Sequence, residues 1–457
     1  MGIQRRILKS FILVSGDIAI FYAALFLMVF VRHYELPLKY HLYVHLAPFS
    51  IIFGIWLAVF FISGLYELRI VKNTPAFYDR LYKVFLFNAA VAISVFYLLP
   101  YFHITPRANL FIVIVIAFLF VAAWRFAAQS VMARRGASRV LFFGLSREVV
   151  ELADFLKQNP QLGYITAASM TAGEEEAPEN PPFKIFSFNH HLRHIIQDER
   201  IELIVASSEI KKSEALVRML FQAVPLGVPV IDFISFYESV TGKIQVSLVG
   251  EAWFLENLVG VKKNYYEFFK RAVDLLTTAA LGVPALALFP FIALAVKIDS
   301  AGPIFYKQRR VGRDGKEFSL VKYRSMTKDA EKMDWRKGGS TDPRLTRVGA
   351  ILRKSYLDEL PQIINVFRGE MSFVGPRPER PEFVRELKEK IPFYEIRLLV
   401  KPGITGWAQV NMENDASVED AMEKIQYDLA YIKNRSVWLD VTIALRTIMT
   451  MLSRSGR

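Results

Sequence analysis

Two adjacent carboxylates, Asp358 and Glu359, stand just ahead of Pro361 in an arginine-rich part of the chain. Proline is favoured in a first helical turn and glycine just past the last one, so this spacing predicts a helix that ends at Gly369. Carboxylates at a helix start face unpaired backbone N–H groups, which stabilise negative charge. The pair therefore has a setting in which both carboxylates stay ionised.

Arg353, Arg368 and Arg377 flank the acidic pair. Their forked guanidinium donors match the geometry of phosphate. An acidic pair among arginines is typical of a divalent metal and phosphoryl chemistry. Plain capping of an amphipathic helix is the competing interpretation, and spacing alone does not separate the two.

The residue types that are missing exclude several other kinds of catalysis. The chain has no cysteine, and His194 is the last of its seven histidines. The C-terminal region therefore cannot use a thiolate, an imidazole or a Cys/His zinc site. No G-x-x-x-x-G-K-[ST] loop is present to hold phosphate. Chemistry after residue 260 must rest on carboxylates, lysine, arginine, hydroxyls and an oxygen-ligated cation, which we expect to be Mg²⁺.

Residues 1–130 are predicted to be a four-helix transmembrane region. Residues 11–31, 46–66, 84–101 and 108–124 are apolar runs, and ~20 such residues cross the ~30 Å hydrocarbon layer. The last two runs are short. No small-residue cleavage site follows the first run, so we expect an anchor and not a removable signal peptide.

Lysine and arginine around these runs predict the orientation. One side of the bilayer receives Arg5, Arg6, Lys9, Arg69, Lys72, Arg80, Lys83, Arg134, Arg135 and Arg139, and the other only Arg32, Lys39 and Arg107. The first side is therefore the cytoplasmic face of the membrane. A net charge of +13 fits binding to an anionic leaflet, and the chain has no zinc-finger or RNA-binding motif, so we expect no nucleic-acid partner.

Residues 138–250 are predicted to form a small Rossmann-like domain. Strands are expected at 139–144, 164–170, 201–207 and 228–234, with helices at 147–157, 189–199 and 211–223, and a surface loop at 171–182. Such alternation indicates a parallel sheet with helices on its faces.

Only Gly144 occupies a glycine position of the G-x-G-x-x-G dinucleotide fingerprint, which needs three. Tyr266 and Lys270 match a dehydrogenase spacing that also occurs often by chance. We therefore interpret this domain as a structural or regulatory module that could pair two subunits into a homodimer.

A fifth apolar stretch, 268–297, opens the C-terminal α/β unit at 264–457 and contains Pro284 and Pro290. The unit is also expected to have amphipathic surface helices, because the stretch 437–452 is amphipathic and suited to lying along the leaflet surface. Its length permits crossing, but lysine and arginine lie on both sides of it. We expect it to enter the bilayer and turn back, because proline kinks a helix and so provides a place to turn.

Several ordered blocks in residues 264–457 resemble the monotopic phosphoglycosyl transferases of bacteria. The blocks are Asp299-Ser-Ala-Gly-Pro-Ile-Phe-Tyr-Lys-Gln-Arg-Arg-Val-Gly312, Val321-Lys-Tyr-Arg-Ser-Met326, Leu357-Asp-Glu-Leu-Pro-Gln362, Ser372-Phe-Val-Gly-Pro-Arg-Pro378, Lys401-Pro-Gly-Ile-Thr-Gly-Trp-Ala-Gln-Val-Asn411 and Tyr427-Asp-Leu-Ala-Tyr-Ile-Lys-Asn434. The whole chain is similar to the long form of that family, in which four spans and a degenerate nucleotide-fold domain, resembling a CoA-binding domain, precede the catalytic unit. The turning proline is expected a few residues from Pro284 and Pro290, so the position of the bend is not fixed.

This resemblance implies a transfer of sugar-1-phosphate from a UDP-sugar to undecaprenyl phosphate with release of UMP, at the start of exopolysaccharide, capsule or O-antigen synthesis. Asp358 would be the nucleophile, and Glu359 would be its neighbour in binding Mg²⁺. The matched blocks and their flanks assign substrate or phosphate binding to Lys322, Arg324, Arg353, Arg377 and Asp428. An ionised aspartate needs no general base, in keeping with a region that has no histidine.

Two other functions stay open at this point. A membrane-bound nucleotide-sugar dehydratase or epimerase is one, since some share such a front end. A non-catalytic scaffold for polysaccharide assembly is the other. The identity of the sugar cannot be read from the sequence, because it depends on the shape of a pocket.

Overall fold

The computed structural model describes residues 2–33, 38–67, 73–98, 107–134, 137–171, 182–188, 190–207, 213–258, 264–327, 344–412 and 418–454. The chain divides into two compact units, Met1–Thr241 and Gly242–Arg457. The surface loop expected at 171–182 lies almost wholly outside the described residues.

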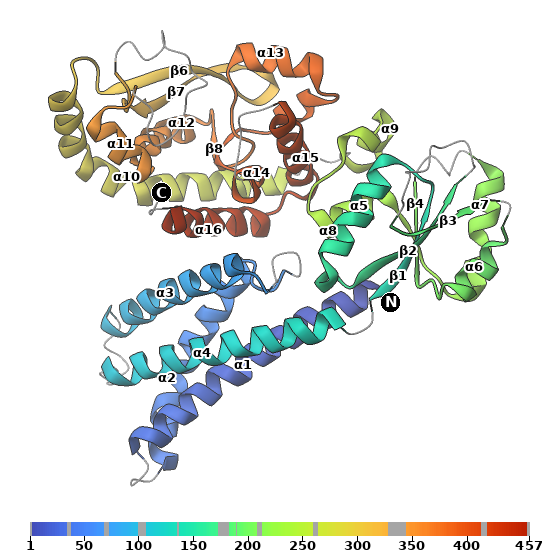
Figure 1. Cartoon of the computed structure of the whole chain (residues 1–457). Helices are drawn as coiled ribbons and strands as arrows, with labels where there is room; N and C mark the ends of the chain where they lie inside the picture. Colours follow the sequence, from blue (N-terminus) through green and yellow to red (C-terminus); the bar gives the residue numbers. More distant parts are fainter. Residues whose placement is uncertain are drawn as a thin grey trace. The chain divides into compact units, whose positions relative to one another are not determined.

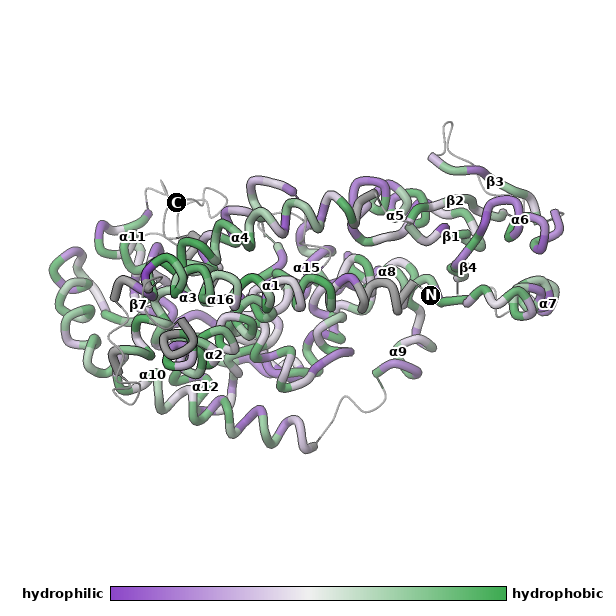
Figure 2. Tube along the Cα trace, turned by 90° about the horizontal axis from the view of Figure 1, so that it is seen from below, coloured by the Kyte–Doolittle hydropathy of each residue, from purple (hydrophilic) through white to green (hydrophobic). Residues whose placement is uncertain are grey.

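Four long helices form the N-terminal part of the first unit, α1 (Gly2–His33), α2 (Leu38–Ile62), α3 (Pro75–Leu98) and α4 (Arg107–Arg134). Segments of α1, α2 and α4 are apolar and long enough to span a bilayer. The third expected span falls in α3, which does not meet this measure over the residues that the structure describes and which carries Asp79, Arg80 and Lys83 near its start. Much of α1, α3 and α4 consists of hydrophobic residues (Figure 2). These helices fit a membrane protein.

One polar cluster interrupts the apolar interior of this bundle. The guanidinium of Arg125 on α4 pairs with the carboxylate of Asp17 on α1 at 2.5 Å, and neither side chain is exposed. Tyr66, just after α2, donates its hydroxyl to the same carboxylate at 2.9 Å. Arg125 also donates to the carbonyl of Leu65 at 2.7 Å. The cluster therefore links α1, the segment after α2, and α4.

The same unit contains a five-stranded parallel sheet with the order β3-β2-β1-β4-β5. Its elements are β1 (Ser138–Phe143), α5 (Arg147–Gln158), β2 (Tyr164–Thr171), β3 (Lys184–Ser187), α6 (Leu192–Asp198), β4 (Leu203–Ala206), α7 (Glu214–Phe221), β5 (Val230–Asp232) and α8 (Phe233–Thr241). The expected parallel sheet is confirmed. The strand expected at 228–234 is wrong at its end, because the Asp232 carboxylate accepts from the N–H of Ser235 and begins helix α8.

The second unit contains a long helix and a β-hairpin together with several shorter elements (Figure 1). Its elements are α9 (Glu251–Leu258), α10 (Asn264–Asp299), β6 (Phe305–Val311), β7 (Glu317–Tyr323), α11 (Arg347–Lys354), η8 (Leu357–Gln362), α12 (Ile363–Arg368), β8 (Ser372–Val374), α13 (Pro381–Lys390), β9 (Gly403–Thr405), α14 (Trp407–Asn411), α15 (Val418–Asn434) and α16 (Val437–Arg454). Strands β6 and β7 are antiparallel, and β8 and β9 pair in parallel.

Helix α10 is apolar and poorly covered by the rest of the chain. It contains Pro284 and Pro290, and only 11% of its apolar segment is buried. Figure 1 shows that α10 changes direction along its length. A kink is expected where a proline removes a backbone donor from the helix. The re-entrant course expected for residues 268–297 stays a prediction.

Candidate active site

Asp358 and Glu359 lie in η8, a short 3₁₀ helix, and the following α12 ends at Gly369 in the left-handed conformation. The expected stop is therefore confirmed, but the carboxylates stand within the first turn and not ahead of it. Tyr356 precedes them with φ of 57°, an unfavourable value for a residue with a Cβ. This backbone bend directs the chain from α11 into the acidic turn.

Two cations hold the Glu359 carboxylate. Lys322 on β7 donates to Oε1 at 2.6 Å, and Arg377 donates to the same oxygen at 3.2 Å. Burial alone would raise the pKa of Glu359, but the charges of Arg377 and Lys322 outweigh it and lower the pKa to about 2. Glu359 is therefore a fixed anion at neutral pH.

Asp358 has a different environment from its neighbour. Its side chain is 7% exposed, and the structure gives its carboxylate no hydrogen-bond partner within the described residues. Burial raises the pKa of Asp358; the charges of Lys322, Arg353 and Arg377 act in the opposite direction. Arg353, at the end of α11, donates to the Ser325 hydroxyl at 3.1 Å. Asp358 is thus a carboxylate close to positive charges whose oxygens are still available.

Asn365 holds the acidic turn to the strand that carries Lys322. It is fully buried on α12, and its Oδ1 accepts from the N–H of Val321 while its Nδ2 donates to the carbonyl of Ser319. The amide thereby pairs with the free edge of β7 as a neighbouring strand would. The separation of Lys322 from Glu359 is fixed by this contact.

Arg377 belongs to the Gly-Pro-Arg-Pro loop, which two other arginines hold by its carbonyls. Arg397 donates to the carbonyl of Arg377 at 2.8 Å, and Arg310 donates to that of Pro378 at 2.9 Å. The carboxylate of Asp428 lies 2.9 Å from the Arg397 guanidinium, and both side chains are buried. Asp428 therefore supports Arg377 from behind through Arg397.

The Gly-Pro-Arg-Pro loop packs against the loop that follows Lys401. Gly375 donates to the carbonyl of Thr405, and Gly403 donates to that of Pro376, both at 2.9 Å. A Cβ on Gly375 would lie 2.4 Å from the carbonyl oxygen of Lys401, so only glycine fits there. This close approach places two loops, far apart in sequence, on either side of one cavity.

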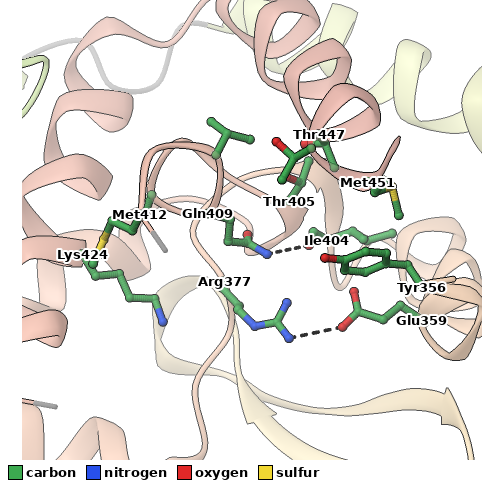
Figure 3. A pocket seen from close by; sticks show the side chains of 13 residues that line it. Tyr356, Glu359, Arg377, Ile404, Thr405, Gln409, Met412, Lys424, Thr447 and Met451 are labelled. Atoms are coloured by element: carbon green, nitrogen blue, oxygen red, sulfur yellow. Dashed lines mark hydrogen bonds and ion pairs between the residues drawn. The ribbon is translucent and has the colours of Figure 1, made fainter. Parts of the chain in front are cut away.

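That cavity has a volume of about 260 Å³ and is lined by the acidic turn, the Arg377 loop, β9, α14 and α16. Figure 3 shows Glu359 and Arg377 joined at one end of it, with Gln409, Thr405 and Met451 among the other lining side chains. The cavity is therefore charged at the end formed by Glu359 and Arg377, and amide, hydroxyl and aliphatic groups line the rest of it.

The acidic pair fits a divalent cation in part. No group of three or more His, Asp or Glu side chains capable of holding a metal occurs in the part of the chain that the structure describes. Mg²⁺ in phosphoryl-transfer sites is bound through one or two carboxylates, with water and substrate phosphates completing its shell. Asp358 and the second oxygen of Glu359 supply that number of ligands.

Residues 265–454 match the family model described as bacterial sugar transferase. One relative, from Xanthomonas campestris pv. campestris, is named UDP-glucose:undecaprenyl-phosphate glucose-1-phosphate transferase. It is 33% identical over 329 residues, which cover 69% of this chain and 67% of the relative. The chain belongs to the bacterial sugar transferase family.

Two further relatives of this bacterial sugar transferase are more similar over shorter stretches. An N-acetylgalactosaminephosphotransferase that uses undecaprenyl phosphate, from Aeromonas hydrophila, is 38% identical over 52% of this chain and 56% of its own. A glucose-1-phosphate transferase from Escherichia coli K12 is 41% identical over 39% of each chain. The matches therefore span 56% and 39% of the length of these two relatives.

Arg324 does not join the site of this sugar transferase. It follows β7, and its guanidinium donates to the carbonyls of Val296, Ser300 and Ala301 at the C-terminal end of α10. Among the described contacts it makes none with the acidic pair. The structure places Arg324 at a helix end, and its phosphate role stays a prediction. Asp428 is a buried anion paired with Arg397, and its expected role in substrate binding also stays a prediction.

Sequence reasoning missed two side chains of α10 that hold this arrangement. Arg271 donates to the carbonyls of Val366 and Phe367 at the end of α12, at 2.7 and 2.8 Å. Asp274, one turn later, accepts from the Ser372 hydroxyl and the Phe373 N–H, at 2.9 and 3.1 Å. A carboxylate inside an apolar stretch was the available signal, since such a residue needs a partner.

Proposed function

We propose that this protein transfers sugar-1-phosphate from a UDP-sugar to undecaprenyl phosphate and releases UMP. The observation that carries this proposal is the anchored pair of Glu359 with Lys322 and Arg377 beside the available carboxylate of Asp358. The names of the relatives support the same reaction class. The product would be the first lipid-linked sugar of an exopolysaccharide, capsule or O-antigen.

The proposed reaction has two displacements. A carboxylate oxygen of Asp358 attacks the β-phosphorus of the UDP-sugar, and the bond from that phosphorus to the bridging oxygen breaks, so UMP leaves with the electron pair. An oxygen of undecaprenyl phosphate then attacks the same phosphorus and releases Asp358. Each attacking group is already an anion, so no general base is needed. Two steps allow a water-soluble donor and a lipid acceptor to use one site in turn.

The other residues position and neutralise phosphate in this proposal. Lys322, Arg353 and Arg377 offset the negative charge that accumulates on the phosphoryl oxygens. Asp358 and Glu359 would hold Mg²⁺, which supplies further neutralisation of the diphosphate when bound. Asp428 acts through Arg397 and Arg377, as a positioning residue.

The proposal also extends to the membrane and to the parts of the chain. The helices in 1–130 would anchor the protein in the inner membrane, 138–250 would be the degenerate Rossmann-like module, and 264–457 would be catalytic on the cytoplasmic face. Residues 268–297 would enter the bilayer and return. The exposed apolar side chains of α10, such as Leu276, Leu286 and Phe291, support insertion. Pairing into a homodimer stays a prediction.

The test uses purified full-length protein with undecaprenyl phosphate and a panel of UDP-sugars. We expect release of UMP with at least one sugar, and labelling of the protein by a donor that carries radiolabel in its β-phosphate. Asp358→Asn should abolish the labelling and lower turnover by at least about a thousandfold. Full turnover in that variant would remove the nucleophile assignment. A dehydratase or epimerase would alter the sugar without releasing UMP, and a scaffold would do neither.

A further inference from the structure

The cavity beside Glu359 is small for a whole nucleotide sugar. Its volume of about 260 Å³ lies below the ~300–1,000 Å³ typical of pockets for drug-sized ligands. Arg377 provides guanidinium donors at one end (Figure 3). Aliphatic side chains, such as Ile404 and Met451, line other parts of it. The space suits a single ring attached to a phosphate.

Gln409 on α14 lines this cavity and carries a buried acceptor. Its Nε2 donates to the carbonyl of Ile404 at 3.1 Å, and this bond fixes the orientation of the amide, because a carbonyl can only accept. The Oε1 atom is then buried and has no hydrogen-bond partner within the described residues. A buried amide oxygen without a partner is costly, and a ligand donor would satisfy it.

Thr405 adds a second acceptor to the same wall. Its hydroxyl lies 2.6 Å from that of Thr447, which already donates its one proton to the carbonyl of Ile443 at 2.8 Å. With the Thr447 proton on Ile443, Thr405 donates to Thr447, and its remaining capacity is as an acceptor. The wall formed by Gln409 and Thr405 thus favours a ligand that brings its own O–H or N–H donors.

We propose that this cavity holds the sugar ring of the phosphosugar, with Gln409 and Thr405 accepting hydrogen bonds from its hydroxyl or amide groups. The inference rests on the proposed function and deepens it. Phosphate has only acceptors and a polyprenyl chain has no donors, so neither fits this wall. Uracil carries two carbonyl acceptors beside its one N–H, and the wall would leave both unpaired. The ribose of the nucleotide also has hydroxyl donors, and UMP inhibition of the variant separates it from the transferred sugar. Gln409 and Thr405 are therefore sugar-binding residues, and Arg377 directs the phosphate toward Asp358.

The test combines Gln409→Leu with analogues of the best UDP-sugar in which one donor group at a time is removed. Wild-type protein must first release UMP with the parent sugar, a result that tests the proposed function separately. We expect Gln409→Leu to raise KM for the parent sugar about tenfold, as for one lost hydrogen bond. With the analogue that lacks the matching donor, the variant and the wild type should perform alike, because the two losses are not additive.

Three controls make the result specific. Inhibition by UMP, which lacks the transferred sugar, and KM for undecaprenyl phosphate should be unchanged in Gln409→Leu. Asn411→Leu removes an amide from the same helix that bonds to the carbonyl of Trp407 and does not line the cavity, so it should keep wild-type kinetics. Thr405→Val should weaken binding of the parent sugar in the same way as Gln409→Leu.

Other outcomes would overturn the proposal. Weaker UMP inhibition in Gln409→Leu would assign the cavity to the nucleotide, and a changed KM for undecaprenyl phosphate would assign it to the lipid. If Gln409→Leu does not fold, wild-type protein still decides the matter. At least one analogue should then have a kcat/KM about tenfold below that of the parent sugar. If all analogues react as well as the parent sugar, the cavity does not accept hydrogen bonds from the sugar.

Discussion

Asp358 and Glu359 are neighbours in sequence but have opposite electrostatic environments. Lys322 and Arg377 hold Glu359 and keep its pKa at about 2. Burial raises the pKa of Asp358, and its oxygens stay available within the described residues. Two carboxylates whose pKa values are driven apart commonly divide their tasks. In the proposed reaction Glu359 is an anchor for the cations, and Asp358 is the group that reacts.

A residue-scale prediction concerns Glu379, which lies behind the site. Lys424 and Arg397 lower its pKa despite burial, so the folded state favours the carboxylate. This contribution to stability is complete above its ordinary pKa of 4.5 and is lost as the pH falls below that value. Glu379→Gln should therefore unfold more easily than wild type at pH 7, by about 3–5 kcal/mol.

The measurement is thermal or denaturant unfolding of both proteins in detergent between pH 7 and pH 3. The difference between them should shrink as the pH falls below 4.5. Both proteins contain Asp428, so the difference reports Glu379 alone. A constant difference across this range would contradict the assignment.

At the scale of elements, α10 joins the two halves of the candidate site. Arg271 holds the end of α12, and Asp274 holds the start of β8, one turn apart on the same helix. The acidic turn precedes α12, and Arg377 follows β8. The helix that we propose to insert into the bilayer therefore sets the spacing between Asp358 and Arg377.

The corresponding prediction compares two changes of Asp274. Asp274→Ala removes the acceptor for Ser372 and Phe373, and we expect it to lower turnover about tenfold with an intact fold. Asp274→Asn keeps an acceptor oxygen and should retain most of the activity. UMP release and a thermal melt of each variant provide the comparison. Equal activity of both variants would show that the contact does not position the site.

The sequence was sufficient for elements with strong local signals. Alternating apolar runs predicted the parallel sheet, and glycine after an apolar helix predicted the end of α12. Contacts made across the fold were not predictable. Arg324 and Asp428 have the charge of site residues, but the carbonyls and the arginine that they meet come from distant segments. Gln409 carried no signal, because its proposed role depends on an unpaired atom in the lining of a cavity.

At the scale of the whole molecule, the natural lack of cysteine makes topology directly testable. Single cysteines at Tyr265 and Lys307 flank the apolar part of α10, and both positions are exposed. If this segment enters and turns back, both should react with a membrane-impermeant thiol reagent from the cytoplasmic side. A cysteine at Arg107, expected on the other side, should react only from there. Labelling of 265 and 307 from opposite sides would show a complete crossing.

The pair formed by Asp17 and Arg125 has a consequence for how the protein is made. An arginine on a lone membrane helix opposes insertion, by about 2.5–3.5 kcal/mol where it lies at the helix centre. Its carboxylate partner lies 108 residues earlier, on a helix that leaves the ribosome first. Stable integration of α4 therefore depends on α1 already being in the bilayer. A protein that lacks α1 should therefore insert α4 poorly, because Arg125 would lie in lipid without its partner. A protein that lacks both helices, or in which both charges are replaced, has no such unpaired arginine.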